Sequence, residues 1–351
     1  ESLLLAVPQG EADRPPGLQP EAPDLAILVV PSKLIVSMMT ELGELGTRHA
    51  IIMSAGFKET GEEGRSLEKE ILEVCESYGM RFLGPNCMGV LNTHHPFNCT
   101  VSPFSGKPGA FGLISQSGTY VAQTHQHLKK RGIALGKAIS AGNSTSIGLE
   151  DCLEYLGDDE DTKAIGLYIE AIEHGDRFLE LAREITPRKP IVAQYVGGTK
   201  SGARSGQSHT GAMAGPDNIY DGLFDQAGIL RVDTVEELYY VCHALSSQPT
   251  PRGSRVGILT NSGGPATAMA MTLENLGIEI SDFSSALRGA IEPLIPPHGS
   301  SRNPVDVTLN RDRSTVSEKL PEILLESDEI DGLLIHGVTD TGWIKNCLLY
   351  T

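Results

Sequence analysis

The sequence predicts an α/β protein built on parallel sheets. Short runs rich in Val and Ile alternate with longer stretches of helical period, which is the pattern of successive βαβ units. Hydrophobic residues make up 40% of the chain and charged residues 21%, as in an ordinary globular protein. Because 351 residues exceed what one hydrophobic core usually supports, we expect more than one α/β domain.

The predicted strands succeed one another along the whole chain, at residues 24–30, 49–55, 80–84, 110–115, 133–140, 163–170, 190–196, 255–260 and 331–337. Candidate helices lie between them, for example at 63–79 and 234–247. Two stretches rich in Pro, Gly and Ser, 94–109 and 247–253, are typical of domain boundaries. The pattern therefore predicts three segments, at 1–105, 106–248 and 249–351.

Charge and cysteine content exclude several classes of protein. A net charge of −17 argues against a nucleic-acid-binding surface. No apolar run reaches membrane-spanning length, and the first residues do not resemble a signal peptide. The cysteines are scattered without a CxxC pair, so neither a zinc site nor a disulfide framework is indicated. We expect no metal site on this chain, no nucleic-acid or membrane partner, and a cytoplasmic location.

One short pattern occurs twice, as GLISQSG at 112–118 and GILTNSG at 257–263. Each is an apolar strand that ends in a Gly-containing turn before a helical stretch. Such a turn presents backbone N–H groups at a helix N-terminus, where anions bind. Each turn alone is equally consistent with a tight βα connection, but the repetition favours two anion sites. The candidate phosphate-binding residues are Ser115, Gln116, Ser117, Gly118, Asn261, Ser262, Gly263 and Gly264.

The segment 202–215, GARSGQSHTGAMAG, surrounds one histidine with small residues that cannot form a core. It is either a linker or a functional loop, and long loops that follow a buried strand are usually functional. We therefore interpret His209 as a ligand-facing side chain; the alternative is a solvated or structurally bonded imidazole. Glu170, at the end of the strand 163–170, is either a solvent-facing carboxylate or the group that orients this imidazole.

Six motifs in this order resemble one known family. From about residue 24 to about residue 340, the chain is similar to the CoA-binding half of the ADP-forming acyl-CoA synthetases, relatives of succinyl-CoA synthetase. The motifs are SAGFKETGEEG at 54–64, GPNCMGVLNT at 84–93, LISQSGT at 113–119, SHTGAMAG at 208–215, LTNSGGPA at 259–266 and RNPVDVT at 302–308.

The resemblance implies a Rossmann-like CoA-binding domain followed by two flavodoxin-like domains of the succinyl-CoA-synthetase type. Residues 1–23 lack the family's Gly-rich turn, so we expect the first domain to be incomplete and the third to be truncated. The resemblance also implies that His209 carries a phosphoryl group, that Glu170 holds its ring and that Ser115–Gly118 cradles the phosphate. It assigns CoA to Val30, Pro31, Ser54, Asn86 and Cys87.

The implied reaction converts acyl-CoA and phosphate to acyl phosphate and CoA. The phosphoryl group then passes to His209 and on to ADP, which with Mg²⁺ occupies an ATP-grasp domain or subunit absent from this chain. A neutral imidazole is a suitable acceptor. We expect a ligase that is active only with that partner, in an oligomer. The alternatives are the CoA-sensing regulatory half of a protein acyltransferase and a simple nucleotide-binding protein; the SHTG motif with Glu170 favours the enzyme.

Overall fold

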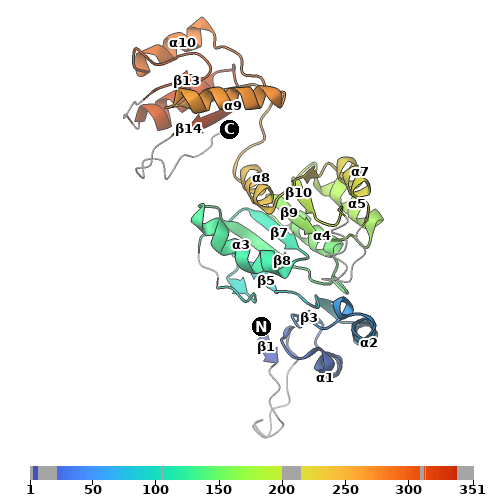
Figure 1. Cartoon of the computed structure of the whole chain (residues 1–351). Coiled ribbons are helices and arrows are strands. Elements are labelled where there is room, and N and C mark those ends of the chain that lie inside the picture. Colours follow the sequence, from blue (N-terminus) through green and yellow to red (C-terminus); the bar gives the residue numbers. More distant parts are fainter. Residues whose placement is uncertain are drawn as a thin grey trace. The chain divides into compact units, whose positions relative to one another are not determined.

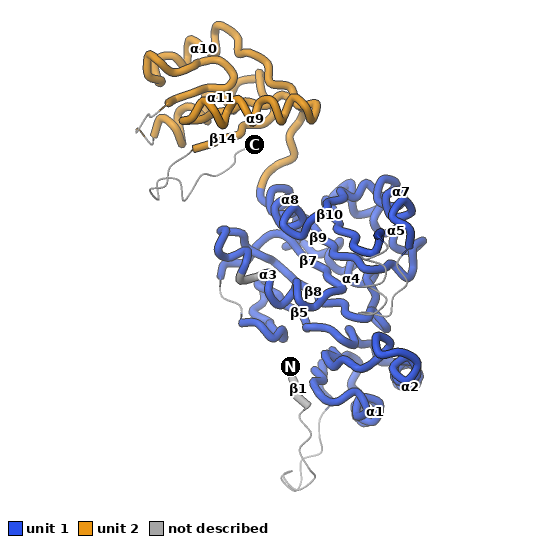
Figure 2. Tube along the Cα trace, in the orientation of Figure 1, with its two compact units in different colours: residues 1–247 blue, residues 248–351 orange. Residues whose placement is uncertain are grey.

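The computed structural model describes residues 3–6, 22–103, 106–199, 215–308, 312 and 314–337, with the backbone alone for residues 3–6, 125 and 126. Its packing divides the chain into two compact units, 1–247 and 248–351 (Figure 2). Every sheet in the described residues is wholly or mainly parallel, and helices lie between the strands. The predicted α/β class is confirmed.

The first sheet has four parallel strands in the order β1-β2-β3-β4. They are β1 (Leu3–Ala6), β2 (Leu25–Leu28), β3 (His49–Ile52) and β4 (Arg81–Leu83), with helices α1 (Ile35–Leu45) and α2 (Glu62–Tyr78) between them. Phe57 and Phe82 are fully buried in the core that this sheet forms with its helices. Three of the four strands were predicted, whereas β1 was not.

The second sheet has the order β11-β10-β9-β7-β8-β5-β6. Its strands are β5 (Val90–Asn92), β6 (Phe97–Asn98), β7 (Phe111–Ser115), β8 (Leu135–Ser140), β9 (Ala164–Ile169), β10 (Ile191–Tyr195) and β11 (Leu230–Arg231). The strands β7 to β11 are parallel, and their order is that of a flavodoxin-like sheet. β5 and β6 extend the sheet in antiparallel fashion beside β8.

Helices cover both faces of this second sheet (Figure 1). α3 (Gly118–Lys130) and α8 (Val235–Ser247) pack on one face, and α4 (Leu149–Asp158), α5 (Gly175–Ile185) and α7 (Asp217–Ala227) pack on the other. Adjacent residues of β7 alternate between these two cores: Leu113 packs with Leu238 of α8, and Ile114 packs with Leu153 of α4. Burial on both faces explains why these strands are continuous apolar runs in the sequence.

The chain changes from the first sheet to the second earlier than the predicted boundary after residue 105. β5 and β6 lie within the predicted first segment, yet they are hydrogen-bonded into the second sheet. The Pro-rich stretch 94–109 therefore connects strands of one sheet. The division of the chain into three domains stays a prediction.

The second unit repeats part of this topology. Its strands β12 (Val256–Thr260), β13 (Val305–Asp306) and β14 (Gly332–His336) form a parallel sheet in the order β13-β12-β14, which matches the order β8-β7-β9. The helices of this unit are α9 (Gly263–Asn275), α10 (Ser285–Ile291) and α11 (Leu320–Glu326). The sequence echo thus reflects a shared arrangement of strands.

Short 3₁₀ turns occur along the chain at Ser32–Leu34, Lys58–Thr60 and Glu292–Leu294, and a π-helical turn at Thr315–Lys319.

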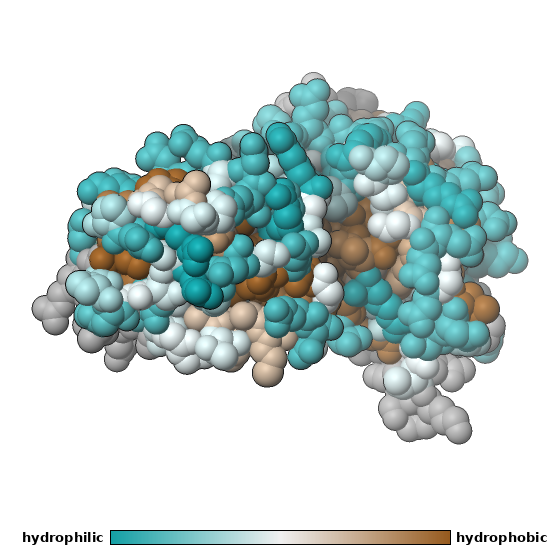
Figure 3. Space-filling view, turned by 90° about the horizontal axis from the view of Figure 1, so that it is seen from above, coloured by the Kyte–Doolittle hydropathy of each residue, from teal (hydrophilic) through white to brown (hydrophobic). Residues whose placement is uncertain are grey.

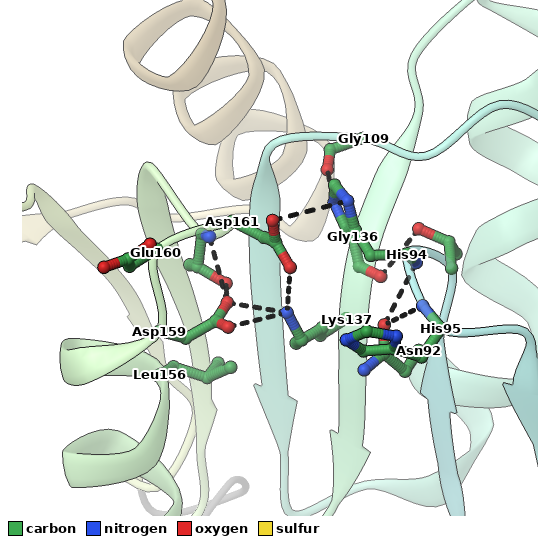
Figure 4. A network of polar contacts seen from close by, with 12 residues as sticks. Asn92, His94, His95, Gly109, Gly136, Lys137, Leu156, Asp159, Glu160 and Asp161 are labelled. Carbon is green, nitrogen blue, oxygen red and sulfur yellow. Dashed lines mark hydrogen bonds and ion pairs between the residues drawn. The ribbon is translucent and has the colours of Figure 1, made fainter.

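An ion-pair cluster around the buried Lys137 lies near the amino-terminal ends of β8 and β9 (Figure 4). Lys137 Nζ lies 2.7 and 2.8 Å from the two carboxylate oxygens of Asp159 and 3.1 Å from Asp161. Burial lowers the pKa of Lys137, but the hydrogen bonds to the two carboxylates outweigh it and raise the pKa overall. Asp161 also faces His94, whose Nε2 lies 2.8 Å from the carbonyl oxygen of Gly109. The cluster therefore lies at the amino-terminal ends of the strands, away from the site described below, which lies at their carboxyl ends.

The visible surface is mostly hydrophilic, with hydrophobic residues in scattered areas (Figure 3). Isolated apolar side chains do reach solvent, such as Met271, 60% exposed, and Leu276, 73% exposed. Within the described ranges, no helix has both the length and the apolar character needed to cross a membrane.

Candidate active site

The candidate site lies where the strand order of the second sheet reverses. β8 lies on one side of β7, whereas β9, β10 and β11 follow on the other side. Ligands of open α/β sheets bind outside the carboxyl ends of the strands at such a point. At this point the turn Ser115–Gly118 connects the end of β7 to α3, and Glu170 follows the last residue of β9. Ser115 is in register with Tyr168, so the two strands end side by side. The fold therefore brings together the first predicted phosphate turn and the predicted carboxylate.

Glu170 is buried rather than solvent-facing. It directly follows β9 and is 8% exposed, so the alternative of an open strand-end carboxylate is wrong. His209 falls in 200–214, outside the described residues. The contact between Glu170 and His209 therefore stays a prediction.

Side chains from other elements hold the backbone of the loop 170–174. The Ile172 N–H donates to the hydroxyl of Tyr220 in α7 at 3.1 Å. The His174 N–H donates to the carboxylate of Glu150 in α4 at 3.2 Å, and Glu150 is almost fully buried. Such contacts keep a loop in one conformation, which a site that must align reacting groups requires.

The described ends of the segment that contains His209 are fixed beside this loop. Tyr195, the last residue of β10, donates its hydroxyl to the carbonyl of Gly215 at 2.8 Å. The rings of Tyr195 and Tyr220 are stacked, with centroids 3.5 Å apart. Because Tyr220 also holds Ile172, the chain enters and leaves the predicted histidine segment close to the loop of Glu170.

The turn Ser115–Gly118 uses several of its polar groups internally. The hydroxyl of Ser115, which is fully buried, donates to the carbonyl of Ser117 at 2.7 Å. The N–H of Gln116 donates to the carbonyl of Tyr168 at 3.2 Å. Ser117 and Gly118 are partly exposed and stand at the start of α3, where backbone N–H groups have no partner within the helix. Phosphate binding at this turn stays a prediction, with Ser117 and Gly118 as its most suitable residues.

A loop from the first sheet packs onto this helix start. A Cβ at Gly118 would lie 2.5 Å from Met88 Cγ, so only glycine fits the observed packing. The N–H of Met88 donates to the hydroxyl of Ser140 at 2.9 Å. The GPNCMG motif at 84–89 thus lies against the predicted phosphate turn.

The predicted CoA residues gather at the carboxyl ends of β2, β3 and β4. The hydroxyl of Ser54 bonds both the N–H and the carbonyl of Val30, and the N–H of Asn86 donates to the carbonyl of Ser54. Pro31 precedes the short helix that follows β2 and is exposed. Cys87 is buried, which raises the pKa of its thiol to about 12. Its thiol is therefore protonated at neutral pH, and CoA binding by these individual residues stays a prediction.

Asn143 lies in the loop after β8 and bonds residues that pack beside the first sheet. It was not among the residues predicted from the sequence. Its side-chain nitrogen donates to Glu59 at 2.8 Å and to Glu68 at 2.7 Å, while its backbone carbonyl accepts from Lys58 Nζ at 2.7 Å. Lys58 also forms an ion pair of 2.9 Å with Glu173, in the loop of Glu170. The place of Asn143 in the polar loop shortly after the predicted strand 133–140 is a weak sequence signal, and it does not give the partners of Asn143.

The two glutamates that share Asn143 have opposite pKa shifts. Burial raises the pKa of Glu68, and its hydrogen bonds from Asn143 and the Lys58 N–H do not fully offset this. Burial also acts to raise the pKa of Glu59, but hydrogen bonds from Asn143, Phe57 and Gly56 outweigh it and lower the pKa overall. A hollow of about 550 Å³ lies beside residues 173–177, which include Glu173, the ion-pair partner of Lys58.

The second predicted phosphate turn, in unit 2, has the same backbone arrangement as the first. The hydroxyl of Thr260 donates to the carbonyl of Ser262 at 3.1 Å, and the N–H of Asn261 donates to the carbonyl of His336. An Asp306 carboxylate oxygen, however, lies 3.0 Å from the position of a Cβ at Gly263. A carboxylate beside the helix start repels a second anion. Phosphate binding by Asn261, Ser262, Gly263 and Gly264 stays a prediction.

Two family models match the chain. A CoA binding domain matches residues 8–93, and a succinyl-CoA ligase like flavodoxin domain matches residues 108–245. The first match includes β2, β3 and β4, and the second includes β7 to β11 with Glu170.

Three similar proteins are named as ligases or synthetases that join an acid to CoA. The alpha subunit of an ADP-forming acetate–CoA ligase II from Pyrococcus furiosus is 39% identical over 91% of this chain and 69% of its own length. An ADP-forming 4-hydroxybutyrate–CoA ligase from Nitrosopumilus maritimus is 36% identical over 87% of this chain, which spans only 44% of that protein. Among solved structures, the dinucleotide forming acetyl-coenzyme A synthetase 1 of Ca. Korarchaeum cryptofilum, in complex with phosphate and ADP, has a TM-score of 0.85 and 32% identity over 94% of this chain and 73% of its own. With these motifs, this strand order and these relatives, the chain belongs to the ADP-forming acyl-CoA synthetase family and corresponds to its CoA-binding, alpha-type half.

Proposed function

We propose that this chain carries out the CoA and phosphohistidine steps of an ADP-forming acyl-CoA synthetase. The observation that carries the proposal is the meeting of Glu170 with the turn Ser115–Gly118 at the switch point between β7 and β9. One helix start for a phosphate and one buried carboxylate for an imidazole are the two supports that a phosphohistidine requires.

In the first proposed step, a phosphate oxygen attacks the thioester carbonyl of the acyl-CoA. The carbon–sulfur bond breaks, and CoA leaves as a thiolate that takes up a proton. The acyl phosphate remains beside the start of α3, where the helix N–H groups offset its charge.

In the second step, the neutral imidazole of His209 attacks the phosphorus, the bond to the acyl oxygen breaks, and the carboxylate product leaves. The imidazole becomes cationic as it takes the phosphoryl group, so a carboxylate from Glu170 stabilises it electrostatically. The burial of Glu170 strengthens this interaction, because charges interact more strongly away from water.

The phosphoryl group then passes to ADP on an ATP-grasp partner, a domain or subunit that binds Mg²⁺ and nucleotide. The relative from Pyrococcus furiosus, which is the alpha subunit of its ligase, supports such a division between subunits. The two named ligases differ in their acid, acetate or 4-hydroxybutyrate, so we leave the acyl group of this chain open.

Radiolabelled phosphate tests the proposal. The chain is mixed with acetyl-CoA and labelled phosphate, and we expect an acid-labile, base-stable label on His209. The variant His209→Asn is the control and takes up no label. Equal labelling of the parent and this variant overturns the proposal, as does a parent that stays unlabelled with acetyl-CoA, 4-hydroxybutyryl-CoA and acetyl phosphate alike.

A further inference from the structure

The side chain of Gln116 is committed to the loop of Glu170. Its carboxamide oxygen accepts the N–H of Glu170 at 2.6 Å and the N–H of Ala171 at 3.0 Å. Its amide nitrogen donates to the carbonyl of Ala171 at 2.9 Å. Gln116 is 8% exposed, so these bonds are made away from water.

These contacts argue against Gln116 as a direct phosphate ligand. Both polar atoms of its side chain already bond residues 170 and 171, and its backbone N–H bonds Tyr168. To turn its amide towards a phosphate, Gln116 would leave two buried N–H groups without an acceptor, which costs about 1–3 kcal/mol for each group.

The same contacts fix the backbone from which the side chain of Glu170 projects. A side chain can reach only the positions that its backbone allows, and Gln116 fixes the backbone on both sides of the bond between residues 170 and 171. Tyr220 and Glu150 fix the following residues, so the loop is held at successive positions from three elements. Preorganisation of this kind is what a catalytic carboxylate needs.

We propose that Gln116 is a positioning residue for Glu170: it acts on phosphoryl transfer through that carboxylate and not by contact with phosphate. This inference rests on the proposed function. It reassigns one residue of the predicted phosphate turn and leaves Ser117 and Gly118 as the phosphate contacts.

The test is a double-mutant cycle on His209 labelling. Gln116→Met keeps the length of the side chain but removes the amide. We expect the maximal labelling rate to fall about 10-fold to 100-fold, as activity does when residues that orient the ligands of a metal site are replaced. The phosphate concentration for half-maximal rate should stay within about two-fold of the parent value, because phosphate contacts are intact.

The second arm of the cycle is Glu170→Gln. If Gln116 acts through Glu170, Gln116→Met slows a Glu170→Gln protein by no more than about two-fold, since the carboxylate is already lost. The matched control is Asn303→Leu, which removes a comparable amide in unit 2, where Asn303 bonds the N–H of Ile258 and the carbonyl of Val256. It should leave the labelling rate unchanged.

The outcomes separate the hypotheses. A higher half-maximal phosphate concentration with an unchanged maximal rate assigns Gln116 to phosphate and overturns the inference alone, as do losses that multiply in the double variant. A parent that takes up no label overturns the proposed function and this inference with it. If Gln116→Met shows no cooperative unfolding transition, Gln116→Asn replaces it in the cycle, because it stays uncharged but is one methylene too short to keep the bonds to residues 170 and 171; the same criteria apply.

Discussion

Met88 Cγ occupies the space that a Cβ at Gly118 would need, so the loop 84–89 and the predicted phosphate turn are packed without clearance. We predict that Gly118→Ala destabilises the protein by about 1–3 kcal/mol, as overpacking does. Thermal and urea unfolding measure this change. Met88→Ala in the same chain should recover part of the loss, because it opens the space. No recovery would show that the clash is relieved elsewhere and that Met88 does not restrict Gly118.

Glu170→Gln should slow labelling of His209 by about 100-fold, while the unfolding temperature stays the same. The amide keeps the size of the side chain but cannot stabilise an imidazolium, and loss of one such electrostatic group typically costs a factor of this order. Quench-flow labelling with acetyl phosphate measures the rate. Glu180→Gln, an exposed position on α5, is the control and should label like the parent. An unchanged rate in Glu170→Gln would remove Glu170 from the mechanism.

The location of Glu170 and of Ser115–Gly118 could be predicted from the sequence because both follow strongly apolar strands. Carboxyl ends of parallel strands share one edge of a sheet, so the order of elements alone places such residues together. Which way a side chain turns is not contained in that pattern. Gln116 was predicted to face phosphate, yet its amide bonds the loop of the neighbouring strand.

The Asn143 contacts could not be predicted for a different reason. They join the loop after β8 to the turn Lys58–Thr60 and to α2, which belong to the first sheet, and sequence patterns describe each sheet separately. Asn143 meets Glu59 and Glu68 where the loop 84–89 bonds the chain after β8: the N–H of Asn143 donates to the carbonyl of Pro85. The early crossing into the second sheet was missed likewise, since β5 and β6 are too short to give an alternating pattern.

The opposite pKa shifts of Glu68 and Glu59 predict opposite effects of pH. The pKa of Glu68 in the folded protein is raised above its usual 4.5, so the ionised side chain costs stability above that raised pKa, and the cost disappears as pH falls towards 4.5. Glu68→Gln should therefore raise the free energy of unfolding at pH 7, with a gain that shrinks in acid. Urea unfolding from neutral to mildly acidic pH measures the gain.

Glu59→Gln is the matched variant, because both carboxylates accept from the amide of Asn143. The folded pKa of Glu59 is lowered, so its carboxylate contributes stability above 4.5 that is lost as pH falls through the folded pKa. Glu59→Gln should lower the free energy of unfolding at pH 7 and have little effect in acid. If both variants shift stability in the same direction at pH 7, this account of the network is wrong.

The Lys137 cluster should matter for stability and not for chemistry. Lys137→Met leaves Asp159 and Asp161 without their shared cation. The pair with Asp159 is largely buried, and removing one partner of a buried pair costs about 3 kcal/mol or more. We expect that loss in urea unfolding, while folded Lys137→Met protein labels His209 at the parent rate. The exposed pair of Arg188 and Asp158 provides the control: Arg188→Met should cost about 1 kcal/mol or less. A slower labelling rate in folded Lys137→Met would contradict this prediction and show that the cluster influences the site at the other end of the strands.

The chain by itself should stop at phosphohistidine. Transfer to ADP needs a site that holds nucleotide, Mg²⁺ and the phosphoryl group in line, and such sites combine metal-binding carboxylates with cationic or Gly-rich phosphate contacts. The turns at Ser115–Gly118 and Asn261–Gly264 each offer one helix start, which suits a single phosphate, and Asp306 places a negative charge beside the second. Mixed with acetyl-CoA, phosphate, ADP and Mg²⁺, the isolated chain should therefore form no more than one phosphohistidine per molecule and no ATP. Addition of an ATP-grasp subunit from a related synthetase should start ATP formation, and His209→Asn should prevent it. ATP produced over many turnovers by the chain alone would mean that it carries a nucleotide site of its own.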